Sequence, residues 1–317
     1  MLNTWKGIAR VATPLLAAGM MFSAQARIAR PGTVNYAEGQ VVLDGNTIGA
    51  KQVGNAEVAP GHVLETQNGK AEVLLTPGVF LRLDDHSAVR MISPSLTDTR
   101  VELLQGRAMV EAAQVRDENC INILDRGADA RIVKHGLYEF RANQPLVAVY
   151  DGKVEVQQND RTVEFGKGKQ LLIGQDKPQK FDRKSAESQD QLYAWSKLRS
   201  EYEAEANAAT AQTFVVGGPG WYGSGWYWNP YFSSWAFLPG DGFFASPFGW
   251  SFYSPAYYGY YAPYRAYGYR PVYGGARPIY RGTGRVPAMR APAPAVSAPR
   301  VAPAPMGGSS IHFGGRR

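Results

Sequence analysis

Apolar and polar residues alternate along residues 33–174, and turns that contain glycine interrupt the alternation repeatedly. Alternation is the pattern of a β-strand with one buried face, because successive side chains of a strand point to opposite faces. No helical pattern separates the runs. Many short strands in succession predict a mainly β fold, here a sandwich or roll of short antiparallel strands.

The clearest predicted hairpin joins "AEVLL" at 71–75 to "VFLRL" at 79–83 through a Thr-Pro-Gly turn. Alternation in the second strand places Leu81 and Leu83 on one face and Arg82 on the other. We therefore expect the two leucines to lie in the core of the β domain.

Three further glycine-containing turns are predicted to be pivots between paired strands. Gly106 interrupts one alternating run, and Asp151-Gly152 interrupts another. An Asp-Gly pair favours a hairpin, because both residues tolerate positive φ. The "GKGK" sequence at 166–169 has the lysines and glycines of a phosphate-binding loop. It lies between two predicted strands and no helix follows it, so a hairpin turn is the better interpretation.

The order of these strands and turns resembles the FecR periplasmic domain family over residues 33–174. The family opens with a glycine-marked strand, continues with a threonine-bearing segment and ends with a "val-x-x-gly-x-val" turn. The matching positions are Gly61, Thr66, Gly69, Leu103, Gly106, Val110, Val149, Gly152 and Val154. They are turn and core positions, so the resemblance implies a fold more than a function.

FecR regulators combine a cytoplasmic anti-sigma segment, one membrane span and this exported domain, which receives a signal from a TonB-dependent outer-membrane receptor. We expect this chain to have neither the cytoplasmic segment nor a retained span. It also has "TPG" at 76–78 where many relatives have an asp-gly-ser turn. Relay of a signal to a sigma factor is therefore not carried over directly from the family.

The first 26 residues have the pattern of a secretory signal peptide. Lys6 and Arg10 precede an apolar run at 11–22, and Ala24-Gln25-Ala26 follows it. The run is shorter than the roughly 20 residues that a membrane-spanning helix needs. We expect cleavage after Ala26 and a periplasmic or secreted protein.

Residues 184–210 contain neither glycine nor proline and are rich in Ala, Glu and Lys, which predicts a helix. A narrow apolar stripe recurs at three-to-four spacing and consists of Leu192, Trp195, Leu198 or Arg199, and Tyr202. One interpretation is a helix that covers the β domain with Trp195 as its anchor, and the other is a helix that binds a partner.

The composition changes after this helix. Residues 217–255 are rich in Trp, Gly and Pro, which argues against long strands. Residues 256–317 alternate tyrosine with Gly, Pro and Arg and are expected to be disordered, because so few aliphatic residues cannot offset the entropy of ordering. From residue 213 onward the chain has nine arginines, no lysine and one acid, Asp241, a net charge of +8.

Aromatic rings and arginines of this region are the candidate binding residues, since rings stack on sugars and arginine attracts polyanions. They are Trp221, Trp226, Trp228, Tyr257, Tyr260, Arg265 and Arg270.

No sequence pattern indicates catalysis. The four histidines are scattered, and "DDH" at 84–86 lies in a predicted turn, where polar residues are expected for backbone reasons. No nucleophile elbow, Walker A or C-x-x-C motif is present, and the single cysteine, Cys120, is expected to be a small buried residue. We predict no enzyme activity, no cofactor and no metal site.

Taken together, these patterns predict a non-enzymatic cell-envelope protein. Its FecR-like domain is expected to bind a protein or a glycan, to fold without the segments beyond Thr210, and to be held on anionic envelope polymers by the basic tail. The alternative is a component of a FecR-type signalling system for sigma-factor regulation that lacks its own anti-sigma segment. A nucleic-acid partner is not expected for an exported chain.

Overall fold

The structure, a computed structural model, describes residues 29–216 and 220–261. These residues all belong to the first of the two units of the chain, Met1–Tyr269. The predicted signal peptide and the predicted tail beyond residue 261, with Arg265 and Arg270, lie outside the described residues.

Fifteen strands form one large sheet, which is antiparallel except where β6 pairs with β8, so the prediction of a mainly β fold is confirmed. In chain order the strands of this sheet are β1 (Val34–Leu43), β2 (Asn46–Thr47), β3 (Val63–Leu74), β4 (Val79–Leu83), β5 (Ala88–Ser95), β6 (Asp98–Gln105), β7 (Arg107–Ala112), β8 (Ile121–Asp125), β9 (Ala128–Ile132), β10 (Gly136–Arg141), β11 (Leu146–Asp151), β12 (Lys153–Gln158), β13 (Arg161–Gly166), β14 (Lys169–Leu172) and β15 (Gln179–Lys180).

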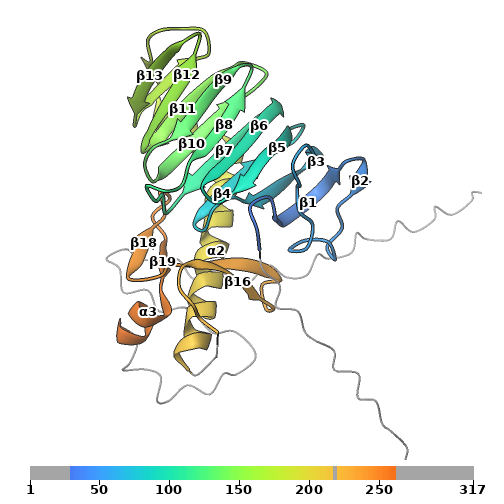
Figure 1. The fold of residues 1–317 in the computed structure, drawn as a ribbon, viewed down its shortest axis with the longest axis vertical. Coiled ribbons are helices and arrows are strands. Elements are labelled where there is room, and N and C mark those ends of the chain that lie inside the picture. The colour runs from blue at the N-terminus through green and yellow to red at the C-terminus, as the bar shows by residue number, and fades with distance from the viewer. Residues whose placement is uncertain (1–28, 217–219, 262–317) are drawn as a thin grey trace, which may run out of the picture. The chain divides into compact units, whose positions relative to one another are not determined.

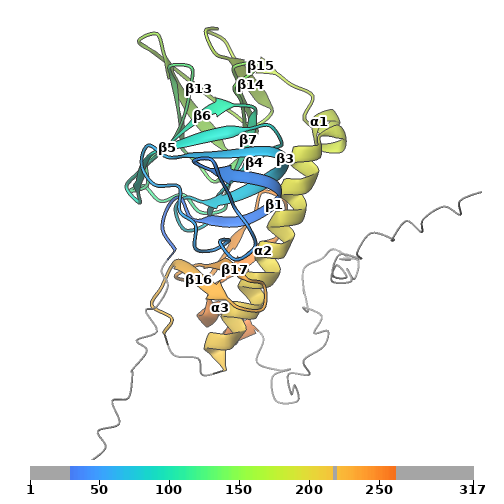
Figure 2. The ribbon, with the colours of Figure 1, turned by 90° about the vertical axis from the view of Figure 1, so that its right-hand side faces the viewer.

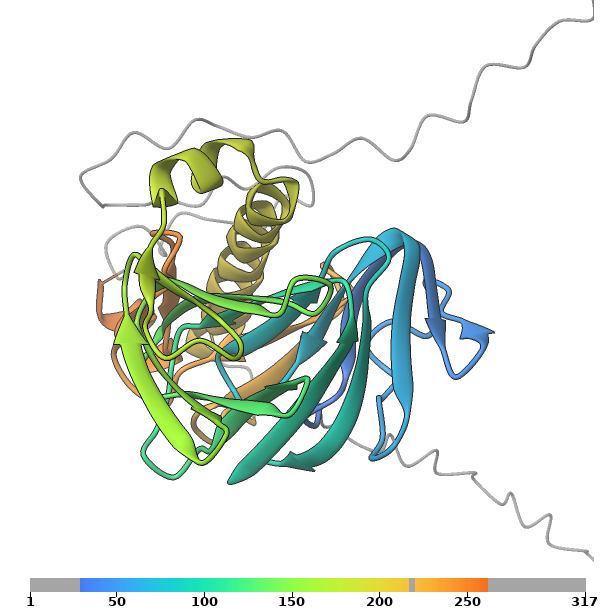
Figure 3. The same ribbon diagram turned by 90° about the horizontal axis from the view of Figure 1, so that it is seen from above.

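The sheet divides into two halves at the long strand β3. The start of β3 pairs with β5, whereas its end pairs with β4. The first half runs β5-β6-β8-β9-β12-β13 and the second runs β4-β7-β10-β11-β14-β15. One apolar cluster draws buried side chains from both halves, so the core lies between them (Figure 3). The architecture is a roll.

The β3–β4 hairpin forms as predicted, with Val73 opposite Leu81. Leu81 and Leu83 lie in the core, and Arg82 points to the outer face of the second half. Arg82 is nevertheless fully buried, because a helix covers that face.

Three predicted hairpins are wrong. Strands β6 and β7, on either side of Gly106, pair with different neighbours, and so do β11 and β12 around Gly152 and β13 and β14 around Gly168. Each glycine has a positive φ, as the turn prediction requires. The chain uses these turns to cross from one half of the roll to the other.

Two helices, α1 (Arg183–Gln189) and α2 (Gln191–Val215), replace the one predicted at 184–210, and the described residues also include α3 (Pro255–Tyr261). The break inside the predicted 184–210 helix occurs at Asp190, whose backbone is extended. Its side chain accepts a hydrogen bond from the N–H of Tyr193, as an N-cap residue does. None of the described helices is both long and apolar enough to cross a membrane.

Helix α2 runs along the outer face of the roll, as the first interpretation of this segment predicted (Figure 2). Leu192 is its fully buried apolar anchor, whereas Trp195 is half-buried. The predicted apolar stripe misses most of the covered face, since Ser196, Ser200 and Asn207 are all buried there.

Residues beyond α2 fold around it. Two hairpins form, β16 (Gly225–Asn229) with β17 (Ser234–Leu238) and β18 (Phe243–Ala245) with β19 (Ser251–Tyr253) (Figure 1). Asn207 donates to the carbonyls of Phe237 and Tyr253 and so connects α2 to both.

The predicted onset of disorder at residue 256 is wrong for residues 256–261, which belong to α3. One aromatic residue of this segment, Tyr258, packs beside Leu238 and Phe214. Cys120 also departs from its prediction. It is only half-buried, because it lies in the loop before β8 and not in a strand.

Candidate binding site at the end of helix α2

A chain of buried charges connects α2 to the roll. On the outer face, Arg82 donates to Glu72 at 2.8 Å and to Glu111 at 2.6 Å. Arg199 of α2 donates to Glu72 at 2.9 Å and to Glu203 at 2.7 Å. All five side chains are buried, so they are held in one arrangement by hydrogen bonds that water cannot replace.

The protonation behaviour of the two carboxylates in contact with Arg199 differs. Burial alone would raise the pKa of Glu72, but Arg199 and Arg82 outweigh burial and hold this pKa at about 2. Burial, together with the negative charge of Glu72, raises the pKa of Glu203 well above its ordinary value. The two arginines therefore favour ionisation of Glu72, whereas burial and the charge of Glu72 oppose ionisation of Glu203.

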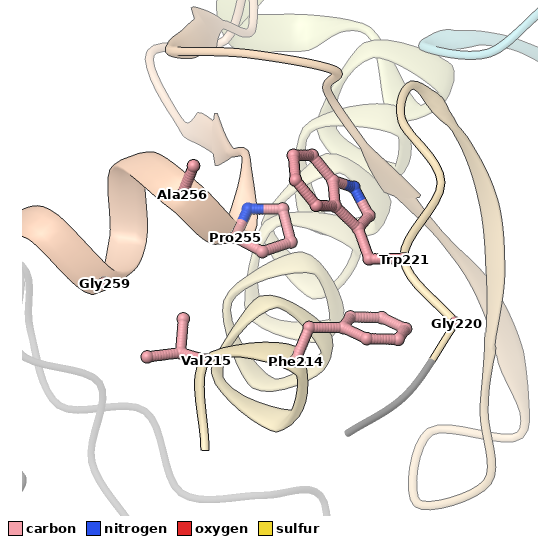
Figure 4. Close-up of a pocket in the computed structure, with 7 residues that line it drawn as sticks. All are labelled: Phe214, Val215, Gly220, Trp221, Pro255, Ala256 and Gly259. Atoms are coloured by element: carbon pink, nitrogen blue, oxygen red, sulfur yellow. The ribbon is translucent and has the colours of Figure 1, made fainter. Parts of the chain in front are cut away.

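The last turn of α2 carries an open pocket of about 440 Å³ (Figure 4). α2 supplies two walls, the start of the following segment supplies two more, and α3 supplies the rest. The lining residues are Phe214, Val215, Gly220, Trp221, Pro255, Ala256 and Gly259. None of them titrates, so the pocket offers apolar contact and no acid, base or nucleophile.

Exposed apolar residues adjoin this pocket in sequence. Val216 is 75% exposed, Tyr222 is 74% exposed and Tyr260 is 75% exposed. Exposed apolar side chains close in sequence to an apolar pocket are consistent with a site of interaction. The arrangement suits the binding of an apolar segment of a partner.

The structure separates the predicted binding residues. Trp221 lines the pocket and Tyr260 follows the lining residue Gly259. Trp226 is buried, with its ring edge-on to Phe80 at 5.2 Å, which leaves no face for a ligand.

Two more of these residues pack against neighbouring rings. Trp228 packs edge-on against Trp235, with ring centroids 5.4 Å apart. Tyr257 stacks on Tyr253, with ring centroids 6.0 Å apart. Arg265 and Arg270 lie outside the described residues. Of the predicted binding residues that the structure describes, one lines the pocket, one lies beside it in sequence, and the other three pack against aromatic side chains.

Sequence reasoning missed the other walls of the pocket. Phe214 and Val215 lie beyond the predicted end of the helix at residue 210, and Ala256 and Gly259 lie where disorder was predicted. The only local signal is the apolar run "FVV" at 214–216 after a polar helix.

The "DDH" turn at 84–86 is structural. Asp84 accepts from Lys70 at 2.5 Å, and His86 adopts a positive φ of 49°. Over residues 29–216 and 220–261, no group of three His, Cys, Asp or Glu side chains is placed to hold a metal ion.

Comparison with known proteins identifies the β region. Residues 62–155 match the family model described as FecR protein. No curated protein matches the chain.

Two crystal structures of a proposed anti-sigma factor from Parabacteroides distasonis ATCC 8503 are similar to parts of the chain. The match to one of them has 20% sequence identity and a TM-score of 0.34, and it spans 40% of this chain and 63% of the crystallised chain. The other is 22% identical, with a TM-score of 0.32, and covers 38% of this chain and 59% of its own. The family assignment rests on the sequence match, and it confirms the resemblance: the chain contains a FecR domain at residues 62–155.

Proposed function

We propose that this protein is a non-catalytic component of a FecR-type signalling system that binds a protein partner through the apolar pocket at the end of α2. The single observation that carries the proposal is the FecR domain at residues 62–155. Placement in the cell envelope is part of the proposal and is supported by the signal-peptide pattern of residues 1–26.

The geometry supports binding as the role of the pocket. Its walls are apolar, and proteins commonly recognise partner segments by burying a few apolar side chains in such a groove. Helix α2 forms one side of the pocket and also carries Arg199, which donates a hydrogen bond to Glu72 of the FecR domain. A partner in the pocket would therefore contact an element that is fixed to the FecR domain.

A second candidate is adhesion to the envelope. Tyr231 is 79% exposed and Phe243 is 50% exposed, both on or beside the C-terminal hairpins. Exposed rings suit stacking on sugars, and the arginine-rich sequence beyond residue 261 suits attraction to anionic polymers.

One genetic experiment separates these two functions. The gene is deleted in its host, and the strain is complemented with the wild-type protein or with Ala256→Glu, which places a charge in the apolar pocket from an exposed position. Leu96→Glu is the matched control, because Leu96 is 49% exposed in the turn between β5 and β6. Transcript levels across the genome are the readout, and thermal melting confirms that both variants fold.

Signalling predicts that deletion changes a defined set of transcripts, that Leu96→Glu restores it and that Ala256→Glu does not. Restoration by both variants would show that the pocket is not used. Unchanged transcripts, together with weaker attachment of the protein to isolated envelopes after removal of residues 262–317, would favour adhesion.

A further inference from the structure

Basic residues are concentrated where the sheet ends. Six basic side chains and only two acidic ones occur in residues 167–184, namely Lys167, Lys169, Lys177, Lys180, Arg183 and Lys184 against Asp176 and Asp182. They lie on the β13–β14 turn, on β14 and β15, on the loop between these strands and on the first turn of α1 (Figure 2). We call this set the basic strip, and all five of its lysines are exposed.

Few of these charges are neutralised. Lys167 pairs with Asp151 at 3.0 Å, and Arg183 pairs with Glu187 at 3.1 Å. Among the described residues, Lys169, Lys177, Lys180 and Lys184 form no ion pair.

The two acidic residues of this segment do not neutralise the charges of these four lysines. Asp176 pairs with Arg161 at 3.0 Å, and Asp182 accepts from the N–H of Ser185 to cap α1.

One pair of opposed residues in the basic strip is unfavourable for strand pairing. Lys169 and Lys180 are directly opposite each other on the antiparallel strands β14 and β15. Like charges at opposed positions destabilise a strand pair. Neither side chain is buried, so packing gives no reason for two lysines here.

We infer that the basic strip is a binding surface for an anionic polysaccharide. Charge complementarity selects an anionic ligand, and it excludes a second copy of the strip and the arginine-rich end of this chain. Exposed lysines are mobile point charges that follow a flexible polyanion, whereas a discrete carboxylate is better held by the planar fork of arginine. Lysine is depleted at protein interfaces, which disfavours a protein partner. The strip and the apolar pocket share no residue, so this inference is independent of the proposed function.

The test is lysine acetylation of the full-length protein with and without polygalacturonate, read by mass spectrometry. No lysine occurs after Lys197, so the arginine-rich end of the chain cannot contribute to the signal. We expect acetylation of Lys169, Lys177, Lys180 and Lys184 to slow by about threefold or more at low salt and to recover at about 0.5 M salt, where screening is strong. Lys51 and Lys197 are exposed controls that should not change.

A pair of charge-matched variants gives a second readout. Lys169→Gln with Lys180→Gln removes two charges and relieves the cross-strand repulsion, so folding is retained. Lys51→Gln with Lys197→Gln removes the same charge elsewhere. Affinity for fluorescent polygalacturonate should fall severalfold more in the first variant. Equal affinities, uniform protection of all lysines, or protection only by vesicles of anionic lipid would overturn the inference.

Discussion

At the scale of single residues, the fold depends on charges that are fully buried and paired. Removal of one partner of such a pair leaves an uncompensated charge in the interior, which typically costs about 3–5 kcal/mol. Arg82→Met removes the shared partner of Glu72 and Glu111, and we expect a loss of this size in urea unfolding. The control is Arg90→Met, whose pair with Glu102 is 41% and 30% exposed and should contribute less than about 1 kcal/mol. Similar losses of unfolding free energy in the two variants would show that the buried ion pairs of Arg82 stabilise the fold no more than an exposed pair does.

A second residue-scale prediction concerns Asp125, which is 2% exposed and whose two carboxylate oxygens have no hydrogen-bond partner among the described residues. Burial raises its pKa to about 6. Because the folded protein holds this proton more tightly than the unfolded chain does, the contribution to stability is present below about pH 4 and is lost as pH rises to 6.

Asp125→Asn should therefore stabilise the protein at pH 8, by up to about 3 kcal/mol, and should have little effect at pH 4. Urea unfolding at both pH values measures this difference. Asp117→Asn, in an exposed loop, is the control and should show no such dependence on pH. A pH-independent effect of Asp125→Asn would mean that the pKa of Asp125 is the same in the folded protein as in the unfolded chain.

The residue scale also shows what alternation can predict. It placed Arg82 opposite Leu81 and Leu83, which is correct. It could not show that Arg82 is buried, because the cover comes from Arg199 and its neighbours on a helix more than a hundred residues later. Only tertiary structure decides whether the second face of a strand meets water or another element.

At the scale of elements, three glycine turns connect strands of opposite halves of the roll. Turns at Gly106, Gly152 and Gly168 were correctly expected, and all three glycines have positive φ, yet the predicted hairpins were wrong. Local turn chemistry fixes where the chain bends. It does not determine whether the next strand pairs with the previous one or crosses to the other half.

Gly152 tests the importance of one such turn. It has a φ of +94°, and a Cβ there would lie 2.1 Å from the hydroxyl oxygen of Tyr138. That hydroxyl accepts from the N–H of Lys153 and donates to the carbonyl of Lys134, so it cannot move freely.

Gly168 has a similar φ of +76° but open space around its Cβ position. Gly168→Ala should cost about 1–2 kcal/mol from backbone strain alone. Gly152→Ala should cost clearly more, because the clash adds to the strain. Thermal melting of the two full-length variants measures the difference, and equal melting temperatures would show that Tyr138 yields easily.

The position of the pocket was the feature that the sequence predicted least well. Its walls come from the end of α2, from the segment that begins at Gly220 and from α3. For α3, the tyrosine- and glycine-rich sequence from residue 256 onward predicted disorder, because few aliphatic residues are present. Aromatic rings packed against α2 supply the burial instead, as Tyr227 and Phe214 do with ring centroids 5.3 Å apart.

At the scale of the whole molecule, the structure changes the expected limit of the folded unit. The sequence predicted that the β domain folds without the segments beyond Thr210. In the structure, the ring centroid of Phe80 in the roll lies 5.2 Å from that of Trp226 and 6.0 Å from that of Phe252. The C-terminal hairpins therefore complete the outer face of the roll. The FecR match at residues 62–155 therefore covers only part of what is packed together.

Two truncated chains test where the folded unit ends. A chain that ends at Tyr261 keeps every described contact and should unfold in one cooperative transition at the same urea concentration as the full-length protein. A chain that ends at Thr210 loses both hairpins and exposes Phe80 and Leu74, which are now fully buried. Loss of packing around two large core residues should cost at least about 3 kcal/mol, lower the unfolding midpoint and permit binding of a hydrophobic dye. If the two chains unfold at the same midpoint, the hairpins contribute nothing to the roll, and the original prediction of an independent β domain holds.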